Sequence, residues 1–206
     1  MSLRRIPAAL IAGLSATLLA GGACRAQSGR ASPQECAPVA TELPATSTAE
    51  ALAGEYQLRL VATSGRRSGS AVEGRLKLQS QLDSLRHRRR LGGAADSTVR
   101  HPLYGSTEVD LGAVDAVLVG STSSLDPMQP GVLVMERHER AGQPPHAEIV
   151  MRLGSDANRR DRQRVDGGYT ALRVRQLSPT GFSGTWASGI QSERSAGYFC
   201  AVRKDG

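Results

Sequence analysis

"GEYQLRLVAT", residues 54 to 63, alternates apolar and polar side chains with a period of two. Tyr56 and Leu58 fall on one face of this segment. Gln57 and Arg59 fall on the other. This period is typical of a β-strand with one face buried and the other in water. The stretch therefore predicts an antiparallel strand at the start of a folded domain.

A second alternating stretch, AVEGRLKLQ at residues 71 to 79, follows directly. Val72, Leu76 and Leu78 share one face of it. The connector SGRRSGS, at residues 64 to 70, is rich in the glycine and serine of tight turns. We therefore expect a β-hairpin over residues 54–80.

The same alternation recurs to the end of the chain, with turn residues between most segments. Its further instances are residues 106–114, 131–139, 147–154, 168–177, 181–189 and 197–204. Only residues 78–93 have leucines at helical spacing, and they predict either helical turns or a long polar loop. We expect an all-β fold: an antiparallel up-and-down eight-stranded barrel, which leaves no open edge, with a β-sandwich as the alternative.

The N-terminus has the pattern of a secretory signal. Arg4 and Arg5 precede an apolar run, and small residues follow it up to Ala23. We expect a signal peptide at residues 1–23 and a flexible tether, rich in Ala, Ser, Thr and Pro, at residues 24–50. The barrel domain would then span residues 51–206, and the protein would be exported.

Cys24 lies where a lipid anchor would be attached. Gly22-Ala23-Cys24 resembles the end of a bacterial lipobox, although Gly21 stands where that motif usually has an aliphatic residue. The resemblance implies that Cys24 is lipidated and that the protein is a membrane-anchored lipoprotein of the bacterial cell envelope. The alternative is ordinary cleavage, which would release a soluble periplasmic or secreted protein.

Cys36 and Cys200 remain once Cys24 is lipidated or removed. In an oxidising compartment such a pair predicts a disulfide, here between the start of the mature chain and its last strand. Closing so long a loop stabilises the fold by about 4–5 kcal/mol in the chain-entropy model. There is no CxxC motif, so we expect a structural role for this pair and no redox role.

The chain is basic, with a formal net charge of +7, and nearly all its cations are arginines. The densest cluster is RHRRR, which contains Arg86, Arg88, Arg89 and Arg90. These residues predict contact with anionic lipid or polysaccharide, or else a plain solvated loop. We expect no nucleic-acid partner for an exported chain.

Motifs of catalysis are missing from the sequence. It has no G-x-S-x-G nucleophile elbow and no HExxH zinc motif. We therefore expect no catalytic residues, no metal site, no cofactor and no enzymatic activity.

Two tripeptides resemble the calycin group, which includes lipocalins and avidins. Gly54-Glu55-Tyr56 is similar to the G-x-W opening of lipocalins, with Tyr in place of Trp. Gly184-Thr185-Trp186 is a full G-x-W near the other end of the domain and resembles avidin-type strands.

The resemblance implies a barrel that encloses one small apolar or amphipathic ligand. Its expected ligand contacts are the aromatic residues Tyr56, Phe182, Trp186 and Tyr198. The alternative is a structural or interaction lipoprotein in which these side chains fill a packed core and the arginine-rich surface contacts anionic envelope components.

Overall fold

The computed structural model describes residues 36–82, 99–118, 120–137, 146–154, 169–190 and 193–204. Nearly all of them lie in strands or in two short 3₁₀ helices. The strands are β1 (Leu43–Pro44), β2 (Gly54–Ser64), β3 (Ala71–Ser80), β4 (Val99–Glu108), β5 (Val132–Arg137), β6 (His146–Leu153), β7 (Tyr169–Ser178), β8 (Gly181–Ile190) and β9 (Glu193–Arg203). The 3₁₀ helices are η1 (Ala49–Leu52) and η2 (Leu111–Val114).

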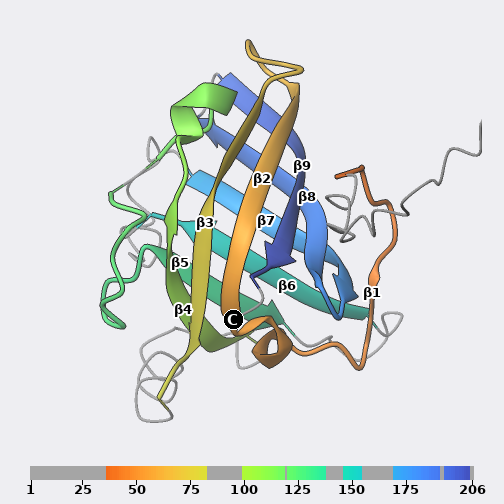
Figure 1. Cartoon of the computed structure of the whole chain (residues 1–206), viewed down its shortest axis with the longest axis vertical. Coiled ribbons are helices and arrows are strands. Elements are labelled where there is room, and N and C mark those ends of the chain that lie inside the picture. The colour runs from red at the N-terminus through yellow and green to blue at the C-terminus, as the bar shows by residue number, and fades with distance from the viewer. Residues whose placement is uncertain are drawn as a thin grey trace, which may run out of the picture. The chain divides into compact units, whose positions relative to one another are not determined.

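Strands β2 to β9 form a closed barrel in which every neighbouring pair is antiparallel (Figure 1). The first and last of them pair along their length, with Leu58 opposite Ala201. The pairing of β6 with β7, which places Met151 opposite Leu172, completes the ring. The predicted up-and-down eight-stranded barrel is confirmed, and closure excludes the sandwich.

Alternation along each strand separates the barrel interior from its outer face. On β2 the inward side chains Tyr56, Leu58, Leu60 and Ala62 are at most 1% exposed. Arg59, between them, lies on the outer face and pairs with Glu73 of β3. The prediction from residues 54–63 is therefore confirmed, as is the hairpin with residues 71–79.

The strand predicted at residues 106–114 is displaced. The structure places β4 at Val99–Glu108 and forms η2 from the last residues of the predicted segment. The side chain of Asp110 accepts a hydrogen bond from the Gly112 N–H at 3.1 Å, which favours a turn over an extended strand. Pro102 and Gly105 weaken the strand signal where β4 actually lies. Of the ambiguous segment 78–93, β3 takes the first residues, and residues 83–93 lie outside the described residues.

Glycines at inward positions let neighbouring strands approach closely enough for the barrel to close. A Cβ at Gly197 of β9 would lie 1.8 Å from the Val61 carbonyl oxygen and 2.7 Å from Trp186 Nε1. A Cβ at Gly184 of β8 would lie 2.0 Å from the Arg173 carbonyl oxygen. Such close approaches are typical of tightly coiled barrel strands.

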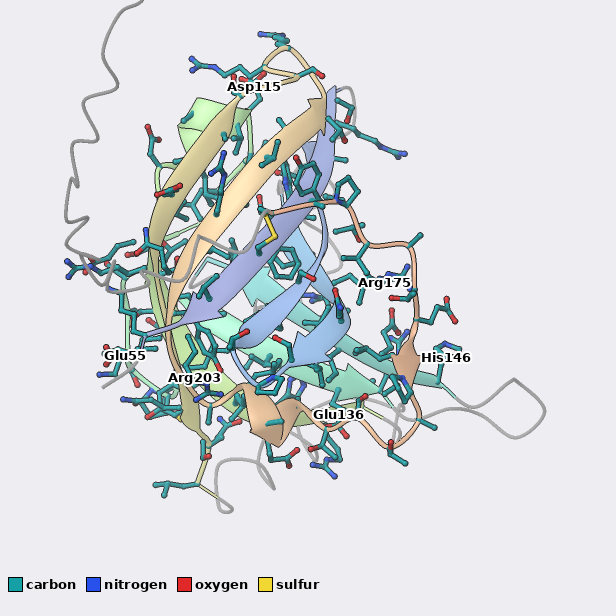
Figure 2. The ribbon with its side chains drawn as sticks, turned by 45° about the vertical axis from the view of Figure 1, so that its right-hand side comes forward. Glu55, Asp115, Glu136, His146, Arg175 and Arg203 are labelled. Carbon is teal, nitrogen blue, oxygen red and sulfur yellow. A yellow bond between two sulfur atoms is a disulfide. The ribbon has the colours of Figure 1, made fainter. Side chains whose placement is uncertain are left out.

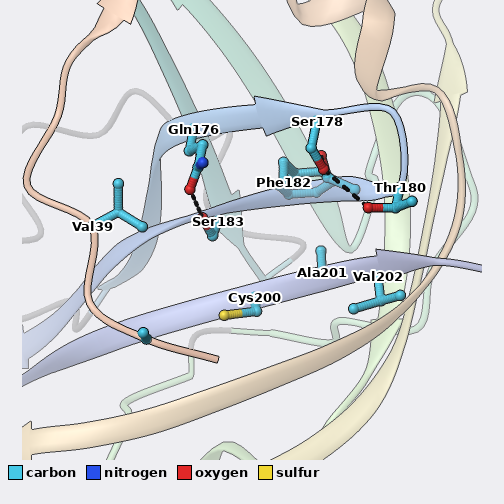
Figure 3. A pocket seen from close by; sticks show the side chains of 11 residues that line it. Val39, Gln176, Ser178, Thr180, Phe182, Ser183, Cys200, Ala201 and Val202 are labelled. Atoms are coloured by element: carbon cyan, nitrogen blue, oxygen red, sulfur yellow. Dashed lines mark hydrogen bonds between the residues drawn. The ribbon is translucent and has the colours of Figure 1, made fainter. Parts of the chain in front are cut away.

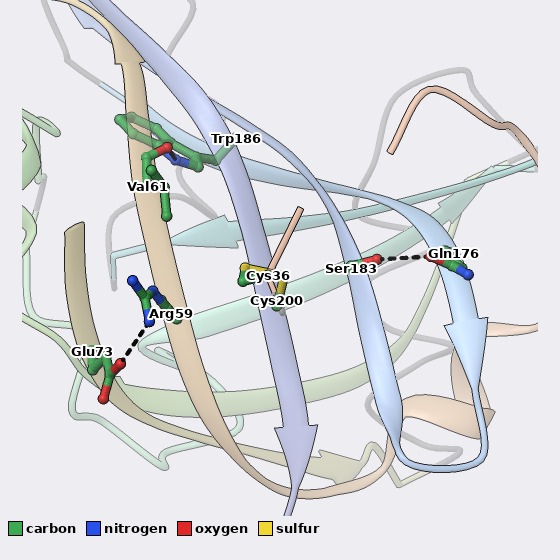
Figure 4. The surroundings of a disulfide bond; sticks show 8 residues. All are labelled: Cys36, Arg59, Val61, Glu73, Gln176, Ser183, Trp186 and Cys200. Carbon is green, nitrogen blue, oxygen red and sulfur yellow. Dashed lines mark hydrogen bonds and ion pairs between the residues drawn. A yellow bond between two sulfur atoms is a disulfide. The ribbon is translucent and has the colours of Figure 1, made fainter. Parts of the chain in front are cut away.

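Residues 36–48, which we call the strap, run over the barrel surface from the last strand to η1. The predicted Cys36–Cys200 disulfide fixes one end of the strap to β9 (Figure 4). Further along, β1 pairs with the start of β6, with Leu43 opposite Ala147. The pairing of β6 with β7 begins only at Val150, so β1 lies beside the part of β6 that β7 does not reach. The strap thus includes part of the predicted tether 24–50, and η1 follows it at Ala49–Leu52.

Gly197→Ala should destabilise the barrel, because its methyl group would meet the backbone of β2. We expect the free energy of unfolding to fall by about 1–3 kcal/mol or more. Ala196→Ser is the matched control, since it adds one atom on the outer face of the same strand and should change stability by less than about 0.5 kcal/mol. Urea unfolding followed by circular dichroism measures both. Equal stability of the Gly197→Ala variant and the parent would contradict the close approach.

Candidate functional site

Three of the four predicted ligand contacts lie together in the barrel interior. Tyr56 and Phe182 meet edge to face, with ring centroids 4.9 Å apart. Phe182 also meets Phe199 of β9, at 6.0 Å. The indole N–H of Trp186 donates to the Val61 carbonyl oxygen at 3.0 Å (Figure 4). All of these rings are buried and belong to one core cluster.

Tyr198 does not share this interior, and its role as a ligand contact stays a prediction. Its neighbour Phe199 is fully buried inside the barrel, and the period of two therefore places Tyr198 on the outer face. Both faces of β9 carry apolar side chains, with Tyr198 and Val202 on one and Phe199 and Ala201 on the other. Alternation alone could not identify the inner face.

The predicted lipidation site and basic cluster lie outside the described residues. These residues are Cys24, Arg86, Arg88, Arg89 and Arg90. In the part of the chain that is described, no group of His, Cys, Asp and Glu residues could hold a metal ion. No helix among the described residues is long and apolar enough to cross a membrane.

The end of the barrel where β2 begins, here called the lower end, is covered by η1. Arg203 of β9 fastens it by donating to the carbonyl oxygens of Ala51 and Ala53, at 3.2 and 3.1 Å. The same guanidinium donates to the Tyr56 hydroxyl at 2.7 Å, and Tyr56 in turn donates to the Leu52 carbonyl oxygen at 3.1 Å. Arg203 also lies over the Tyr56 ring, 5.0 Å from its centroid.

A buried carboxylate, Glu136 of β5, lies at the same end (Figure 2). Its Oε2 accepts a hydrogen bond from the Ala49 N–H at 3.0 Å and lies 3.8 Å from an Arg100 nitrogen. Arg100 also pairs with Glu50 of η1. These contacts offset the cost of burying the charge and hold η1 in place. Sequence analysis missed Glu136, although it shares the inward phase of Val132 and Val134.

The opposite, upper end is covered by residues 110–118, which we call the lid. The lid contains η2, and its side chains Leu111, Val114 and Ala116 are buried in the core cluster. On its outer side Asp115 pairs with Arg67 of the β2–β3 turn at 3.5 Å. Figure 2 shows Asp115 at the end of the barrel remote from Glu136. The lid therefore inserts apolar side chains into the upper end of the barrel.

Three inward hydroxyl groups fasten the lid to strands β7, β8 and β9. The Val117 N–H donates to Ser188 Oγ at 2.7 Å, and Thr170 Oγ1 donates to the Val117 carbonyl oxygen at 2.6 Å. Thr170 and Ser188 lie 2.7 Å apart and share a hydrogen bond. Ser195 Oγ donates to the Asp115 carbonyl oxygen at 2.8 Å. The barrel thus has a small polar site within an apolar interior.

The interior side chains differ in size between the two ends. Towards the lower end and the middle they are large, and include Tyr56, Leu58, Leu76, Leu103, Ile149, Phe182, Trp186 and Phe199. Under the lid, small buried residues lie beside the larger Leu153 and Trp186. We call this region the cup, and define it by the buried residues Ala62, Thr107, Thr170, Ser188, Ser195 and Gly197. The Trp186 indole lies against Gly197, and the buried apolar side chains of the lid belong to the same core cluster.

The cup residues were not predicted as a site. Thr170 lies within the predicted strand at residues 168–177, in phase with the apolar Leu172 and Val174. Ser188 follows Trp186 by two positions and so shares its face. The cup hydroxyls could have been found from one pattern: on adjacent predicted strands, a serine or threonine stands in phase with the apolar inward positions.

A separate pocket lies on the outside, between the strap and the β7–β8 hairpin (Figure 3). Its volume is about 110 Å³, and its lining includes Val39, Gln176 and Val202. Sites for drug-sized molecules usually have about 300–1,000 Å³. Ser183 donates to Gln176 at 3.3 Å, so polar groups of the lining bond to each other. The pocket is too small to be the main binding site.

No known family model and no curated protein matches the sequence. Among solved structures, a redesigned beta barrel, mFAP1, bound to DFHBI is 10% identical, with a TM-score of 0.33; the match covers 75% of this chain and 96% of that one. The S-type phycobiliprotein lyase CPES from Guillardia theta is 11% identical, with a TM-score of 0.38, over 76% of this chain and 90% of that one. Likeness at this level carries no inference about what this chain binds.

Tyr56 should make the folded state sensitive to alkali. Burial raises the pKa of its hydroxyl above the ordinary value of 10.0, and the Arg203 cation acts in the opposite direction. Because the folded-state pKa is above the unfolded value, the stabilisation is complete below about pH 10 and is lost as the pH rises through the folded pKa. Tyr56→Phe should reduce this alkaline loss and, at neutral pH, cost about 1–2 kcal/mol in hydrogen bonds.

Urea unfolding between neutral pH and the alkaline range measures both effects. Tyr198→Phe, on the outer face, is the matched control and should follow the parent protein. Identical alkaline curves for the parent and the Tyr56→Phe variant would contradict the assignment of this pH dependence to Tyr56.

Proposed function

We propose that this chain is an exported, non-enzymatic barrel protein that binds one small amphipathic molecule in the cup, with the lid displaced. The observation that carries the proposal is the convergence of Thr170, Ser188 and Ser195 on the lid, at the upper end of a largely apolar interior. A few placed polar groups in an apolar concavity are the usual composition of a small-molecule site. These three hydroxyls bond to the backbone of the lid. The lid is a connecting segment between β4 and β5, and in this proposal it moves away from the barrel when the ligand binds.

The attachment of the lid supports such a movement. Neighbouring barrel strands are joined by ladders of backbone hydrogen bonds along most of their length. The lid is joined to β7, β8 and β9 through single side-chain hydroxyls. Segments held by few bonds open at lower free-energy cost than the core strands do. A ligand must bury apolar surface comparable to that of Leu111 and Val114 to take the place of the lid.

The proposed location is the bacterial cell envelope, with Cys24 as the lipid anchor. The signal-like N-terminus and the lipobox resemblance support this location. The Cys36–Cys200 disulfide is consistent with it, because disulfides persist in oxidising compartments.

A second candidate is a packed barrel that acts through its surface. The buried cluster that runs from η1 to the lid favours it. The outer face of β5 to β7 is rich in arginine: Arg137 and Arg173 both pair with Glu148, at 3.1 and 3.0 Å. Such a face could contact anionic envelope components through Coulomb attraction. This candidate predicts binding that weakens with salt and does not depend on the cup.

Native mass spectrometry of the exported full chain carrying Cys24→Ala, purified without detergent, tests the first candidate. We expect a reproducible added mass that disappears on denaturation. Ala62→Leu fills the cup and should remove the added mass, whereas Thr63→Val, on the outer face of the same strand, should retain it. Circular dichroism checks that both variants fold. If Ala62→Leu does not fold, Thr170→Val replaces it as the variant of the cup. A bare polypeptide mass for the parent would favour the packed candidate instead.

Lipidation of Cys24 is tested by growing an expressing bacterial host with an alkyne-bearing fatty acid. We expect the full chain to take up the label and to sediment with membranes. Cys24→Ala should lose both properties, because it removes the thiol to which the lipid would be attached. The double variant Cys36→Ala/Cys200→Ala is the control and should keep the label. An unlabelled parent chain would contradict lipidation of Cys24 and leave the soluble periplasmic or secreted alternative.

A further inference from the structure

We infer that the ligand of the cup is an N-acylated peptide, recognised through three consecutive peptide units. This inference rests on the proposed function, since it names the chemical class that the same site would take. It follows from what the lid presents to the hydroxyl groups of Thr170, Ser188 and Ser195: two carbonyl oxygens and one N–H group.

The directions of the hydrogen bonds are fixed by the backbone groups. The Val117 N–H can only donate, so Ser188 Oγ accepts from it. The Val117 carbonyl oxygen can only accept, so Thr170 uses its proton there. The proton of Ser188 is then left for Thr170 Oγ1, 2.7 Å away. The two hydroxyls form a closed ring with Val117 that requires both an N–H and a carbonyl group.

The spacing of these groups is that of a peptide. The Asp115 carbonyl belongs to the first of three successive peptide units, the Val117 N–H to the second and the Val117 carbonyl to the third. Ser195 donates to the first of them at 2.8 Å. A ligand that meets all three hydroxyls in the same way has an amide carbonyl, then an amide N–H, then a further carbonyl, in this order along a backbone.

The apolar part of the ligand lies on the N-terminal side of these groups. In the lid, Leu111 and Val114 precede Asp115 in the chain, and both are buried in the barrel. An acyl chain on the first amide nitrogen would fill the same apolar space and would connect to the peptide from the same side. The cup therefore fits an acyl tail followed by about two residues.

Loss of the central N–H should be costly. An ester in its place leaves Ser188 Oγ facing a second acceptor in a buried site, without the donor that it has in the lid complex. Sites built to bond a particular N–H or O–H reject analogues that lack it more strongly than apolar pockets reject a missing methylene. One unpaired buried group reduces affinity by about tenfold to a hundredfold.

Isothermal titration calorimetry tests the inference with N-octanoyl-Ala-Val N-methylamide, whose groups reproduce this order. Its depsipeptide analogue has an ester in place of the Ala–Val amide, and octanol supplies an apolar tail alone. The protein is the exported full chain carrying Cys24→Ala. We expect the amide to bind at least about tenfold more tightly than the ester. Val114→Ala weakens the lid and should tighten the binding of the amide.

Variants assign the preference to the hydroxyl ring. Ser188→Ala should bring the amide and the ester to similar affinity. A merely structural effect would weaken both probes alike and would not remove the difference between them. The control Thr63→Val should keep the difference. Equal binding of amide and ester to the parent, or binding of octanol alone, would overturn the peptide inference and leave the proposed function standing. If none of the probes bound to the parent or to the Val114→Ala variant, and native spectra showed a bare chain, both proposals would fall.

Discussion

The ring of strand pairs that closes between β6 and β7 constrains everything else in this structure. Each strand must coil strongly to reach its neighbours, and inward glycines such as Gly197 and Gly184 allow the backbones to approach. β7 diverges from the start of β6, and the strap, held there by β1 and by Arg175 pairing with Glu42, occupies the place beside β6. Along the paired strands the ring leaves no free edge, so in the proposed function a ligand would bind at a barrel end or on the outer surface.

The two ends are closed by different chemistry, and the difference indicates which one opens. At the lower end two charged groups hold η1: the Arg203 guanidinium donates to the carbonyl groups of Ala51 and Ala53, and the buried Glu136 carboxylate accepts from the Ala49 N–H. Displacing η1 would take these hydrogen bonds away from both charged groups. At the upper end neutral hydroxyls bond the lid to β7, β8 and β9, and one partly exposed ion pair, Asp115–Arg67, holds its outer side. In the proposed function an uncharged ligand with the same donors and acceptors would replace the hydroxyl bonds at small net cost, which makes the upper end the better candidate for exchange.

Much of the architecture could be predicted from local alternation, because each strand of a half-buried barrel has one polar face. Residues 54–63 and the Cys36–Cys200 pair are examples. Alternation could not identify the inner face where both faces of a strand are apolar, as at Tyr198, and the prediction was wrong where glycine and proline interrupt the pattern, as in β4. The clamp of Arg203 and the hydroxyl site depend on strands far apart in the chain. The sequence does not distinguish a serine in water from one inside a barrel. The inward position of Ser188 is known only once the strand register is known.

A filled interior and a binding function are compatible in this barrel. The cup is built from small residues, and the lid that covers it is a segment of connecting chain whose apolar side chains belong to the same core cluster. In the proposed function a ligand would compete with the lid for the same three hydroxyls and for apolar space. Its apparent affinity would equal its intrinsic affinity multiplied by the fraction of molecules in which the lid is already displaced. Weakening the lid should strengthen binding, whereas filling the cup should weaken it. A barrel packed only for stability would lose stability from both changes and would bind nothing after either.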